Sequence, residues 1–470
     1  MIAARDWITA RDWAGKRYAV LGLARSGAAT VRALLAAGAR VVAWDADEAK
    51  RAAILSGTGR GTSIAGGGGS PPGGPLVEAP RHHPADGPPP RAEEDLRVAE
   101  FGYLAAYDAL VVSPGVPLNT HPIADMARAA GVPIIGDIEL FAQARAELPA
   151  HKVVGITGTN GKSTTTALVH HLLEGAGVPA LMGGNIGLPI LAQPPLPAGG
   201  VYVLELSSYQ IDLTRTLDCD VAVLLNVTPD HLDRYDGFSA YAASKARLFA
   251  MQSAAHAAVI AIGDAASAAI ARSLSARGEQ LTKIAPGMCL DQSRWPALQG
   301  PHNAQNALAA IAVAKALGLD EAAIDRGLAT FAGLPHRMEQ VATIAGVTYV
   351  NDSKATNPDS TAPALAAYPR IHWILGGRAK GDDLDACAPH FGNVVRAYTI
   401  GEAGARFAAV LDGKVPVEAA GTLDVAVARA AGNAIAGDVV LLSPACASFD
   451  QYRDYEDRGA AFRAAVEALR

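Results

Sequence analysis

Cysteine is scarce in this sequence and is never paired at short spacing. Only four cysteines occur among 470 residues, and no C-x-x-C is present. A zinc site and a disulfide framework are therefore not indicated, because both need cysteines at characteristic spacings. Reduced thiols are typical of the cytosol, so we expect a cytoplasmic protein.

Long apolar runs and an excess of positive charge are also lacking. No uninterrupted apolar run reaches the roughly 18 residues of a membrane-spanning helix, so we expect no membrane insertion. The opening stretch MIAARDWITARDW carries charges early and does not have the apolar core of a signal peptide. The net charge of −6 argues against a nucleic-acid partner bound through a broad basic surface.

The sequence does contain repeated strand and helix patterns. In RYAVLGLARSGAATVRALLAAGARVVAWD we predict a strand over residues 18–23, a helix over 28–37 that Gly38 stops, and a second strand over 40–44. A strand, a helix and a strand in this order indicate a parallel sheet, with the helix packed against it.

Two further units of the same kind follow, the second from HKVVGITGTNGKSTTT and the third after GLPHRMEQ. We therefore predict an α/β protein of three domains, residues 1–147, 148–334 and 335–470, each with a mostly parallel sheet. Residues 57–95 are rich in Gly, Pro and Ser and cannot support a packed core. We interpret them as a flexible insertion within the first domain.

The segment GITGTNGKSTTT, residues 155–166, departs from the usual phosphate-binding pattern G-x-x-x-x-G-K-[ST]. That pattern needs a glycine five positions before Gly161, and position 156 is Ile. The context is nevertheless the one that a phosphate loop requires, because an apolar strand leads into the loop and a helix begins inside it.

Each physical element of a phosphate site is present in this loop. Gly158 and Gly161 allow backbone N–H groups to face an anion, and the helix N-terminus favours negative charge. Lys162 can reach terminal phosphates, and Ser163 or Thr164 can offer a hydroxyl to Mg²⁺. An ordinary glycine-rich turn is the alternative interpretation.

Two candidate metal ligands follow apolar strands in the same region. Glu205 ends the strand pattern in VYVLELSS, and His231 follows another strand in LLNVTPDHLDRY. Beside a phosphate loop, Glu205 is well placed to serve Mg²⁺, although a strand-end Glu is often merely exposed. Because Mg²⁺ prefers oxygen ligands, His231 could equally be structural.

Eight segments together resemble the Mur ligase family, and they occur in the family's order: GITGTNGKSTTT, GGNIGLP, LELSSYQ, NVTPDHLDRY, HNAQNALAA, GLPHRME, NDSKATNP and LLSPACASFDQY. The displaced glycine is the family's own form of the loop. The resemblance implies a Rossmann-like N-terminal domain for a UDP substrate and a central P-loop ATPase-like domain. It also implies a C-terminal Rossmann-like α/β domain that binds an amino acid and completes the ATP site.

The segments GDIELF, NDSKATN and LLSPACASFDQY are most similar to the family member that adds D-glutamate to UDP-N-acetylmuramoyl-L-alanine. The resemblance thus implies a monomeric ATP- and Mg²⁺-dependent ligase that forms an amide through an acyl phosphate in peptidoglycan precursor synthesis. Another amino-acid ligase of the family, including a folylpolyglutamate synthetase, is one alternative. A nucleotide-binding regulator without chemistry and a dehydrogenase are the others.

The resemblance assigns the UDP substrate mainly to the first domain. Gly22, Ala24 and Gly27 match the dinucleotide pattern G-x-G/A-x-x-G only loosely, which weakens the dehydrogenase alternative. For Ser113 and Asn185 a role in forming turns is the alternative. The implied contacts to the UDP substrate are Arg25, Ser26, Asp45, Ser113 and Asn185.

ATP and metal ions are assigned to the central domain with help from the third. Lys245 matches a lysine that the family carries as a carbamate, which is a carboxylate-like ligand. Without the resemblance, the sequence around Lys245 would indicate a solvated lysine on a helix. The implied catalytic residues are Lys162, Glu205, His231 and Lys245, and the implied metal ligands are Ser163, Glu205, His231 and carbamylated Lys245. The implied ATP contacts are Gly158, Thr159, Asn160, Gly161, Lys162, Ser163, Thr164, Asn303, Arg337, Asp352 and Lys354.

The acceptor D-glutamate is assigned to the third domain, through Thr356, Lys380, Ser448 and Tyr455. Lys380 can pair with a carboxylate of the amino acid. Position 455 is Tyr where the family pattern leads us to expect Phe, so the ring assigned to D-glutamate carries an additional hydroxyl. Arg337 has an interdomain salt bridge as its alternative role.

We predict that deleting residues 60–90, which lie inside the Gly/Pro-rich insertion, leaves ligase activity largely intact. The composition offers no core and no catalytic motif there, so the folded domains should be unaffected. Steady-state phosphate release by the deletion variant and the full chain checks this. A folded but inactive variant would show that the insertion takes part in function.

Overall fold

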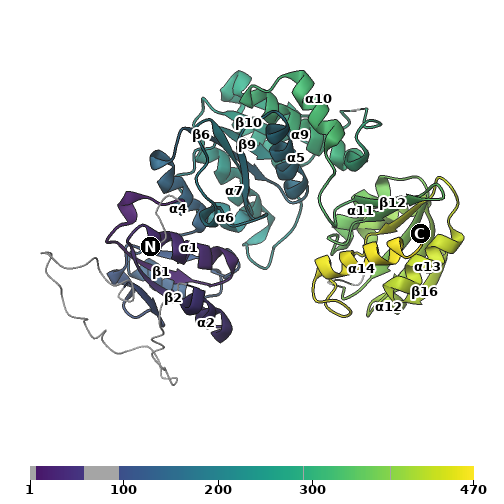
Figure 1. Cartoon of the computed structure of the whole chain (residues 1–470), viewed down its shortest axis with the longest axis horizontal. Coiled ribbons are helices and arrows are strands. Elements are labelled where there is room, and N and C mark those ends of the chain that lie inside the picture. The colour runs from purple at the N-terminus through teal and green to yellow at the C-terminus, as the bar shows by residue number, and fades with distance from the viewer. Residues whose placement is uncertain (1–6, 58–94, 289–290, 380, 382) are drawn as a thin grey trace, which may run out of the picture. The chain divides into compact units, whose positions relative to one another are not determined.

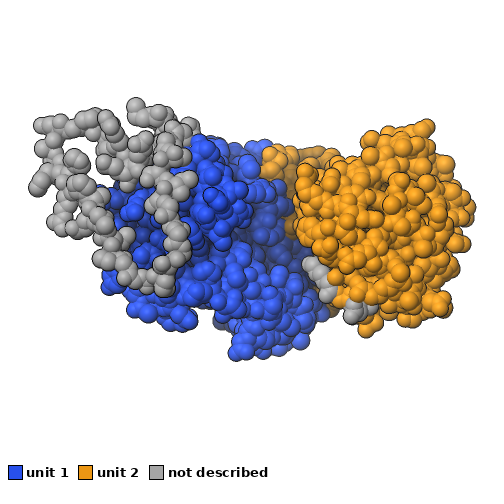
Figure 2. All heavy atoms as spheres, turned by 90° about the horizontal axis from the view of Figure 1, so that it is seen from below, with its two compact units in different colours: residues 1–162, 177–283 blue, residues 163–176, 284–470 orange. Residues whose placement is uncertain are grey.

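The computed structural model describes residues 7–57, 95–288, 291–379, 381 and 383–470 (Figure 1). The predicted insertion at 57–95 lies, except for its two end residues, outside the described residues. The chain forms two compact units, Met1–Lys162 with Gly177–Lys283 and Ser163–Ala176 with Ile284–Arg470 (Figure 2). We call them unit 1 and unit 2 and describe each by itself.

The first sheet of unit 1 consists of β1 (Arg17–Leu21), β2 (Arg40–Trp44), β3 (Leu96–Val98), β4 (Ala109–Val112) and β5 (Ile134–Ile135). The strands pair in parallel in the order β3-β2-β1-β4-β5. The order reverses between β1 and β4, and ligands of such sheets bind beyond the carboxyl ends of the strands at this point. The accompanying helices are α1 (Arg25–Ala36), α2 (Glu48–Gly57), α3 (Ile123–Ala129) and α4 (Asp137–Ala144).

Two boundaries in this region differ from the prediction. The first strand ends at Leu21 rather than at residue 23, because Gly22 turns the backbone with φ 90°. Helix α1 begins at Arg25 rather than at residue 28, so Gly27 lies inside its first turn. A Cβ on Gly27 would lie 1.8 Å from the Gly22 carbonyl oxygen, so only glycine lets the helix approach the strand this closely.

The second sheet contains β6 (His151–Thr157), β7 (Ala180–Gly184), β8 (Gly200–Glu205), β9 (Val221–Leu224), β10 (Ala257–Ala261) and β11 (Leu281–Ile284). Their order is β11-β10-β9-β6-β8-β7, and β6 pairs in parallel with both β8 and β9. Ile156 on β6 lies opposite Glu205, and Thr157 lies opposite Leu224. The carboxyl ends of β6, β8 and β9 therefore meet at one edge of the sheet. The helices that follow these strands in sequence are α5 (Lys162–Gly175), α6 (Ser208–Asp212), α7 (Gly237–Ala250) and α8 (Ala265–Ser273).

The third sheet lies in unit 2 and contains β12 (Glu339–Ile344), β13 (Val347–Asn351), β14 (Ile371–Gly376), β15 (Val394–Ile400), β16 (Val417–Gly421) and β17 (Val439–Leu442). The order is β12-β13-β17-β14-β15-β16, and only the β12–β13 pair among the described pairs is antiparallel. The helices of this unit besides α5 are α9 (Pro301–Leu317), α10 (Glu321–Thr330), α11 (Pro358–Ala366), α12 (Gly404–Leu411), α13 (Leu423–Asn433) and α14 (Tyr455–Glu467).

Short 3₁₀ helices complete the described elements: η2 (Arg11–Trp13), η3 (Leu104–Ala106), η4 (Arg145–Glu147), η5 (Ile190–Ala192), η6 (Ser275–Gln280), η7 (Pro296–Leu298) and η8 (Asp385–Asn393). The predicted α/β class with three mostly parallel sheets is confirmed. The boundaries predicted near 147 and 335 stay predictions. In the part of the chain that the structure describes, no helix has the length and apolar character needed to cross a membrane.

Helix α4, which carries the motif GDIELF, buries two carboxylates. Glu139 is well satisfied, because its oxygens accept hydrogen bonds from the backbone N–H groups of Arg215 (2.7 Å) and Thr216 (2.9 Å). Asp137 is 3% exposed, and burial raises its pKa to about 6, against the opposing effect of the Ile138 N–H. The ionised Asp137 is therefore a destabilising group in the folded chain at neutral pH.

We predict that D137N stabilises the protein, and more so at pH 8 than at pH 5. The folded-state pKa lies above the unfolded value of 3.8, so the wild type loses stability as pH rises between these two values. The full loss is about 3 kcal/mol at roughly 1.4 kcal/mol per pH unit. Urea unfolding of D137N and the wild type at both pH values measures the difference.

The matched control is D125N, because the Asp125 side chain is 83% exposed and pairs only with Arg128 on its own helix. Its effect should be small and nearly independent of pH. A stability gap for D137N that is the same at pH 5 and pH 8 would contradict the assigned titration.

Candidate functional site

The segment between β6 and α5 forms a tight turn around its own carbonyl groups. Gly158 and Gly161 have φ angles of 155° and 86°, which side chains rarely tolerate. Nζ of Lys162 donates to the carbonyl oxygens of Gly158 (2.9 Å) and Thr159 (2.8 Å). The turn thus places a lysine ammonium at the start of a helix, as an anion site requires.

Asn226, two residues beyond the end of β9, holds this turn in place. Its Oδ1 accepts hydrogen bonds from the backbone N–H groups of Thr159 (3.1 Å) and Asn160 (2.8 Å), and its Nδ2 donates to the Asn160 carbonyl oxygen (3.1 Å). Asn226 is not among the site residues predicted from the sequence. Its position after an apolar strand next to the loop was the signal that could have identified it.

Lys245 lies in the interior and is not the solvated lysine of the alternative interpretation. It is 1% exposed, and its Nζ donates to the Gly158 carbonyl oxygen at 2.9 Å. Nζ also lies 4.7 Å from the ring centroid of Tyr241, whose hydroxyl is 3.1 Å from Thr159 Oγ1. Burial, and then the charge of Lys162, hold the pKa of Lys245 well below its usual value. An amine of this kind is readily neutral and hence nucleophilic.

Glu205 is buried at the carboxyl end of β8, with 2% of its surface exposed. Its Oε1 accepts a hydrogen bond from Asn185 Nδ2 at 2.8 Å, and the Asn185 N–H donates to the Glu205 carbonyl oxygen at 2.8 Å. The structure therefore brings together Glu205, predicted as a metal ligand, and Asn185, predicted as a substrate contact.

His231 lies in the loop after β9 and has an unusual backbone, with φ 54°. Its ring centroid is 5.0 Å from that of Tyr209 and 6.2 Å from that of Tyr241. Burial lowers its pKa, Asp230 opposes this, and the charges of Lys162 and Lys245 lower it further. His231 therefore belongs to the same electrostatic neighbourhood as the two lysines.

The predicted UDP contacts gather at the carboxyl ends of β1, β2 and β4. Ser113 Oγ donates to the Gly22 carbonyl oxygen at 2.7 Å, which ties the loop after β4 to the turn after β1. Asp45 accepts hydrogen bonds from the backbone N–H groups of Leu23 (2.7 Å) and Asp47 (2.9 Å). Burial acts to raise the pKa of Asp45, but the two hydrogen bonds outweigh burial, so the pKa is lowered. Ser26 lies in the first turn of α1.

Arg25 also makes a hydrogen bond to another segment of this unit. Its Nη2 donates to the Gly187 carbonyl oxygen at 2.6 Å, within the segment GGNIGLP. The two segments predicted to contact the UDP substrate, around residue 25 and around residue 185, thus lie close together.

In unit 2, two of the predicted nucleotide contacts meet. Arg337 Nη2 donates to Ser163 Oγ at 2.9 Å. Arg337 lies between His336 (φ 62°) and Met338 (φ 48°), so its backbone neighbours occupy a left-handed conformation that only surrounding contacts can hold. Thr164 follows Ser163 in the first turn of α5.

On α9, Asn303 and Asn306 are both 3% exposed and, three residues apart, lie on one face of the helix. Asn306 Nδ2 donates to Asn303 Oδ1 at 3.1 Å, and Asn303 Nδ2 donates to the Gln299 carbonyl oxygen at 3.1 Å. Asn306 therefore orients the amide predicted to contact the nucleotide base.

The third-domain residues gather beyond the carboxyl ends of the neighbouring strands β13 and β17. Asp352 is 7% exposed and accepts a hydrogen bond from Ser443 Oγ at 2.8 Å, and burial raises its pKa to about 7. Lys354 Nζ lies 3.6 Å from the ring centroid of Tyr455. Burial raises the pKa of that Tyr455 hydroxyl to about 12.

The remaining predicted acceptor contacts are only partly described. Ser448 is 2% exposed and follows β17, and Thr356 is half-buried ahead of α11. Lys380 lies outside the described residues. The contact between Lys354 and Tyr455 is therefore the observed link between a predicted nucleotide contact and a predicted acceptor contact.

A magnesium site is consistent with the donor set in unit 1. Within the described ranges, no cluster of three or more His, Cys, Asp or Glu side chains could hold a metal ion. The candidate donors are instead mixed: a buried carboxylate at Glu205, an imidazole at His231 and a buried amine at Lys245. Conversion of that amine to a carbamate would add a second oxygen donor, so the residues fit the ion.

Comparison with known proteins gives consistent matches along the chain. The family described as "Mur ligase middle domain" matches residues 156–288, and the family "Mur ligase, glutamate ligase domain" matches residues 336–446. Proteins named UDP-N-acetylmuramoylalanine--D-glutamate ligase are similar over 98% of this chain. The protein of Novosphingobium aromaticivorans is 59% identical with 97% of its length covered, and that of Zymomonas mobilis is 52% identical with 100% covered.

Solved structures show the same fold at much lower identity. The UDP-N-acetylmuramate-alanine ligase of Thermotoga maritima superimposes with a TM-score of 0.55 at 16% identity, covering 97% of this chain and 100% of that chain. MurF of Acinetobacter baumannii gives a TM-score of 0.52 at 17% identity, covering 76% and 91%. These two likenesses concern the fold alone.

We predict that N226A weakens ATP binding about tenfold with little change in thermal stability. The Asn160 N–H loses its acceptor, and the Thr159 N–H keeps only the backbone carbonyl oxygen of residue 226, to which it donates at 3.0 Å. Hydrogen bonds of this kind contribute about 0.5–1.5 kcal/mol each. Titration calorimetry with a non-hydrolysable ATP analogue measures the change.

The matched control is N433A, since Asn433 also makes side-chain hydrogen bonds, but to Tyr398 and Arg429 in unit 2. It should leave nucleotide affinity unchanged. Equal affinity in N226A and the wild type would mean that the turn keeps its shape without Asn226.

Proposed function

Because the chain belongs to the Mur ligase family, we propose that it joins D-glutamate to UDP-N-acetylmuramoyl-L-alanine with hydrolysis of ATP to ADP and phosphate. The observation that carries this proposal is the likeness to ligases of that name along nearly the whole chain. The phosphate-type turn, with a lysine, a buried carboxylate and a buried amine around it, supplies the chemistry that such a ligase needs.

We assign the phosphates of ATP to the turn after β6. Gly158, Thr159, Asn160 and Gly161 would present backbone N–H groups to the phosphates, and Lys162 would neutralise their charge. The further contacts that we assign are Ser163, Thr164, Asn303, Arg337, Asp352 and Lys354. The contact of Arg337 with Ser163 supports the placement of Arg337 beside the triphosphate.

We assign the UDP substrate to the carboxyl edge of the first sheet, through Arg25, Ser26, Asp45, Ser113 and Asn185. The hydrogen bond of Asn185 to Glu205 supports a substrate that extends from this edge toward the metal ligands. The acceptor D-glutamate is assigned to Thr356, Lys380, Ser448 and Tyr455. The proximity of the Tyr455 ring to Lys354 supports an acceptor site beside the ATP site.

Mg²⁺ would be held by Ser163, Glu205, His231 and Lys245 as a carbamate. Bound there, the ion would offset negative charge on phosphoryl oxygens. The lowered pKa of Lys245 supports carbamate formation, because burial favours the neutral amine that attacks CO₂. The carbamate would also relieve the repulsion between the amines of Lys245 and Lys162.

The chemistry consists of two transfers. The carboxylate of the L-alanyl group attacks the γ-phosphorus of ATP, the bond to the ADP oxygen breaks, and an acyl phosphate forms. The amine of D-glutamate then attacks the acyl carbon, loses a proton and expels phosphate, leaving the new amide. Lys162 and the loop amides hold the phosphoryl group in place, and no covalent bond to the enzyme is needed.

We further propose a cytoplasmic monomer with the domain division 1–147, 148–334 and 335–470. The partners are the three substrates, with neither nucleic acid nor membrane insertion involved. The net charge of −6 and the nucleotide substrates support this description.

A matrix of substrates tests the proposed function. Each UDP-linked precursor is supplied with ATP and, in turn, with L-alanine, D-glutamate, a diamino acid or a dipeptide, and phosphate release is measured. Release only with UDP-N-acetylmuramoyl-L-alanine and D-glutamate is the expected result. Turnover with a different pair would identify another ligase of the family, and ATP binding without turnover for any pair would indicate a regulator.

We predict that K162A lowers the turnover of this pair by at least about a hundredfold. The Lys162 ammonium at this turn would offset negative charge on the transferred phosphoryl group. Groups of this kind contribute about 3 kcal/mol or more to catalysis. Steady-state phosphate release measures the loss. The control is K152A, since Lys152 lies on β6, the strand that leads into the turn, with its side chain exposed. Full activity in K162A would refute the assigned phosphate site.

A further inference from the structure

Two loops of unit 1 are tied together by side chains for which the proposed function gives no role. One loop, residues 113–119, follows β4 and carries the proposed substrate contact Ser113. The other, residues 230–236, carries the proposed metal ligand His231. We propose that Arg234 is a positioning residue that couples binding of the UDP substrate to the placement of His231. This inference rests on the proposed function of the two loops.

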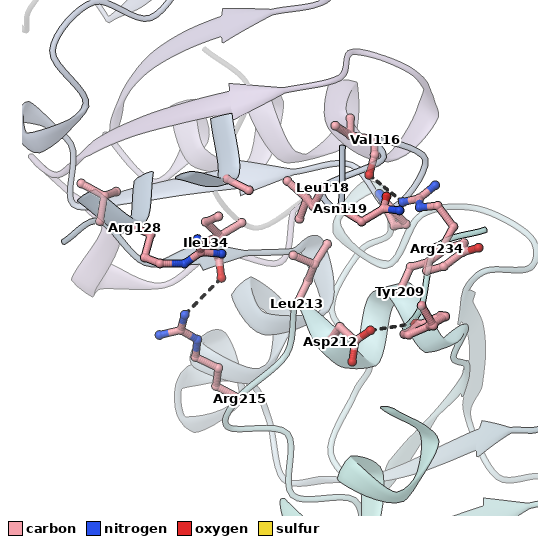
Figure 3. A pocket seen from close by; sticks show the side chains of 14 residues that line it. Val116, Leu118, Asn119, Arg128, Ile134, Tyr209, Asp212, Leu213, Arg215 and Arg234 are labelled. Carbon is pink, nitrogen blue, oxygen red and sulfur yellow. Dashed lines mark hydrogen bonds between the residues drawn. The ribbon is translucent and has the colours of Figure 1, made fainter. Parts of the chain in front are cut away.

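Direct hydrogen bonds connect the loops at two points, and Figure 3 shows the one between Arg234 and Val116. Arg234 Nη2 donates to the Val116 carbonyl oxygen at 2.7 Å. Asn119 Nδ2 donates to the Asp233 carbonyl oxygen at 2.9 Å. Each loop thus provides one side-chain donor and one backbone acceptor, so a shift of either loop is transmitted to the other.

Arg234 also contacts the aromatic group that supports His231. Its guanidinium carbon lies 4.3 Å from the centroid of the Tyr209 ring. The same ring lies 5.0 Å from the His231 ring and stacks on Tyr235 at 6.0 Å. Tyr235 is fixed in turn by a hydrogen bond to Asp212 at 2.7 Å. Arg234 and His231 therefore both lie close to the ring of Tyr209.

Within the loop, the His231 N–H donates to Asp230 Oδ1 at 2.9 Å and the Arg234 N–H donates to the His231 carbonyl oxygen at 2.9 Å. His231, Leu232 and Asp233 are exposed, so little apolar packing fixes them. The left-handed backbone of His231 costs roughly 1–3 kcal/mol and persists only if its surroundings hold it. The links through Arg234 and Asn119 are contacts that can do so.

The substrate loop has a corresponding connection at its other end. Ser113 Oγ donates to the Gly22 carbonyl oxygen at 2.7 Å, in the turn that precedes Arg25. A nucleotide bound at that turn would therefore fix Ser113, and with it Val116. The path from the substrate to His231 then runs through Arg234.

A cavity of about 480 Å³ lies beside these contacts, lined in part by Val116, Tyr209 and Arg234 (Figure 3). The guanidinium of Arg234 thus borders open space. Arg128 lines the same cavity, and its ion pair among the described residues is with Asp125, one turn away on α3. It offers a matched control with the same side chain and no link between the loops.

The test compares R234M and R234K with R128M and the wild type. R234M keeps bulk but loses the donors and the charge. We expect it to lower kcat about tenfold and to raise the half-saturating Mg²⁺ concentration by a similar factor, while the KM for D-glutamate changes less than about twofold. R234K retains the cation above Tyr209 and should recover part of the loss, and R128M should match the wild type.

Hydrogen–deuterium exchange gives a readout that does not require turnover. We expect UDP-N-acetylmuramoyl-L-alanine to slow exchange of residues 228–237 in the wild type and in R128M, but not in R234M. If R234M does not fold, N119A tests the second link, with a smaller change in the same direction expected.

The outcomes separate the inference from the proposed function. If the wild type neither binds the UDP precursor nor turns it over, the proposed function fails. If the wild type is active while R234M, or N119A in its place, keeps normal Mg²⁺ dependence and normal protection of residues 228–237, the coupling role is refuted. A loss of kcat in R234M that R128M shares would equally refute a specific role for Arg234.

Discussion

Two lysine side chains converge on the carbonyl oxygen of Gly158, and the candidate site is organised around this concentration of positive charge. Nζ of Lys162 and Nζ of Lys245 each donate to that oxygen at 2.9 Å. Two unit charges about 4 Å apart repel by roughly 4 kcal/mol at the effective dielectric constant of such a site. Both amines cannot remain charged there without compensation, so the chain either neutralises Lys245 or binds negative groups close by. Glu205, a phosphate chain and a carbamate are the compensating groups that the proposed function supplies.

Much of the fold and several site residues could be predicted from the sequence. Apolar strands followed by glycine turns identified the parallel sheets, and the spacing of Asn303 and Asn306 placed both on one face of α9. The first residue of α1 could not be predicted from the sequence, because glycine is normally unfavourable inside a helix. Gly27 is accommodated for a tertiary reason, the close approach of its Cα to the Gly22 carbonyl, which no local pattern reveals.

The site residues that sequence reasoning missed act through the backbone of other segments. Asn226 binds the turn at Thr159 and Asn160, far away in sequence, and Arg234 binds the carbonyl oxygen of Val116. Neither contact leaves a recognisable spacing in the sequence, since a carbonyl or an N–H group is present at almost every residue. Burial of Lys245 was likewise invisible, because a helix with its mixed composition is equally consistent with an exposed lysine. Only the tertiary fold places that amine against Gly158.

The edge position of β3 affects how freely the chain can vary in length. This strand is the outermost in the first sheet and pairs only with β2 among the described strands. The connection from α2, which ends at Gly57, to β3, which begins at Leu96, therefore enters the sheet far from the central pair β1 and β4. Doubling the length of a loop costs only about 0.6 kcal/mol in loop-closure entropy, so a longer connection at this point would reduce the stability of the fold very little. A change in its length would leave the register of β1, β2 and β4 unchanged.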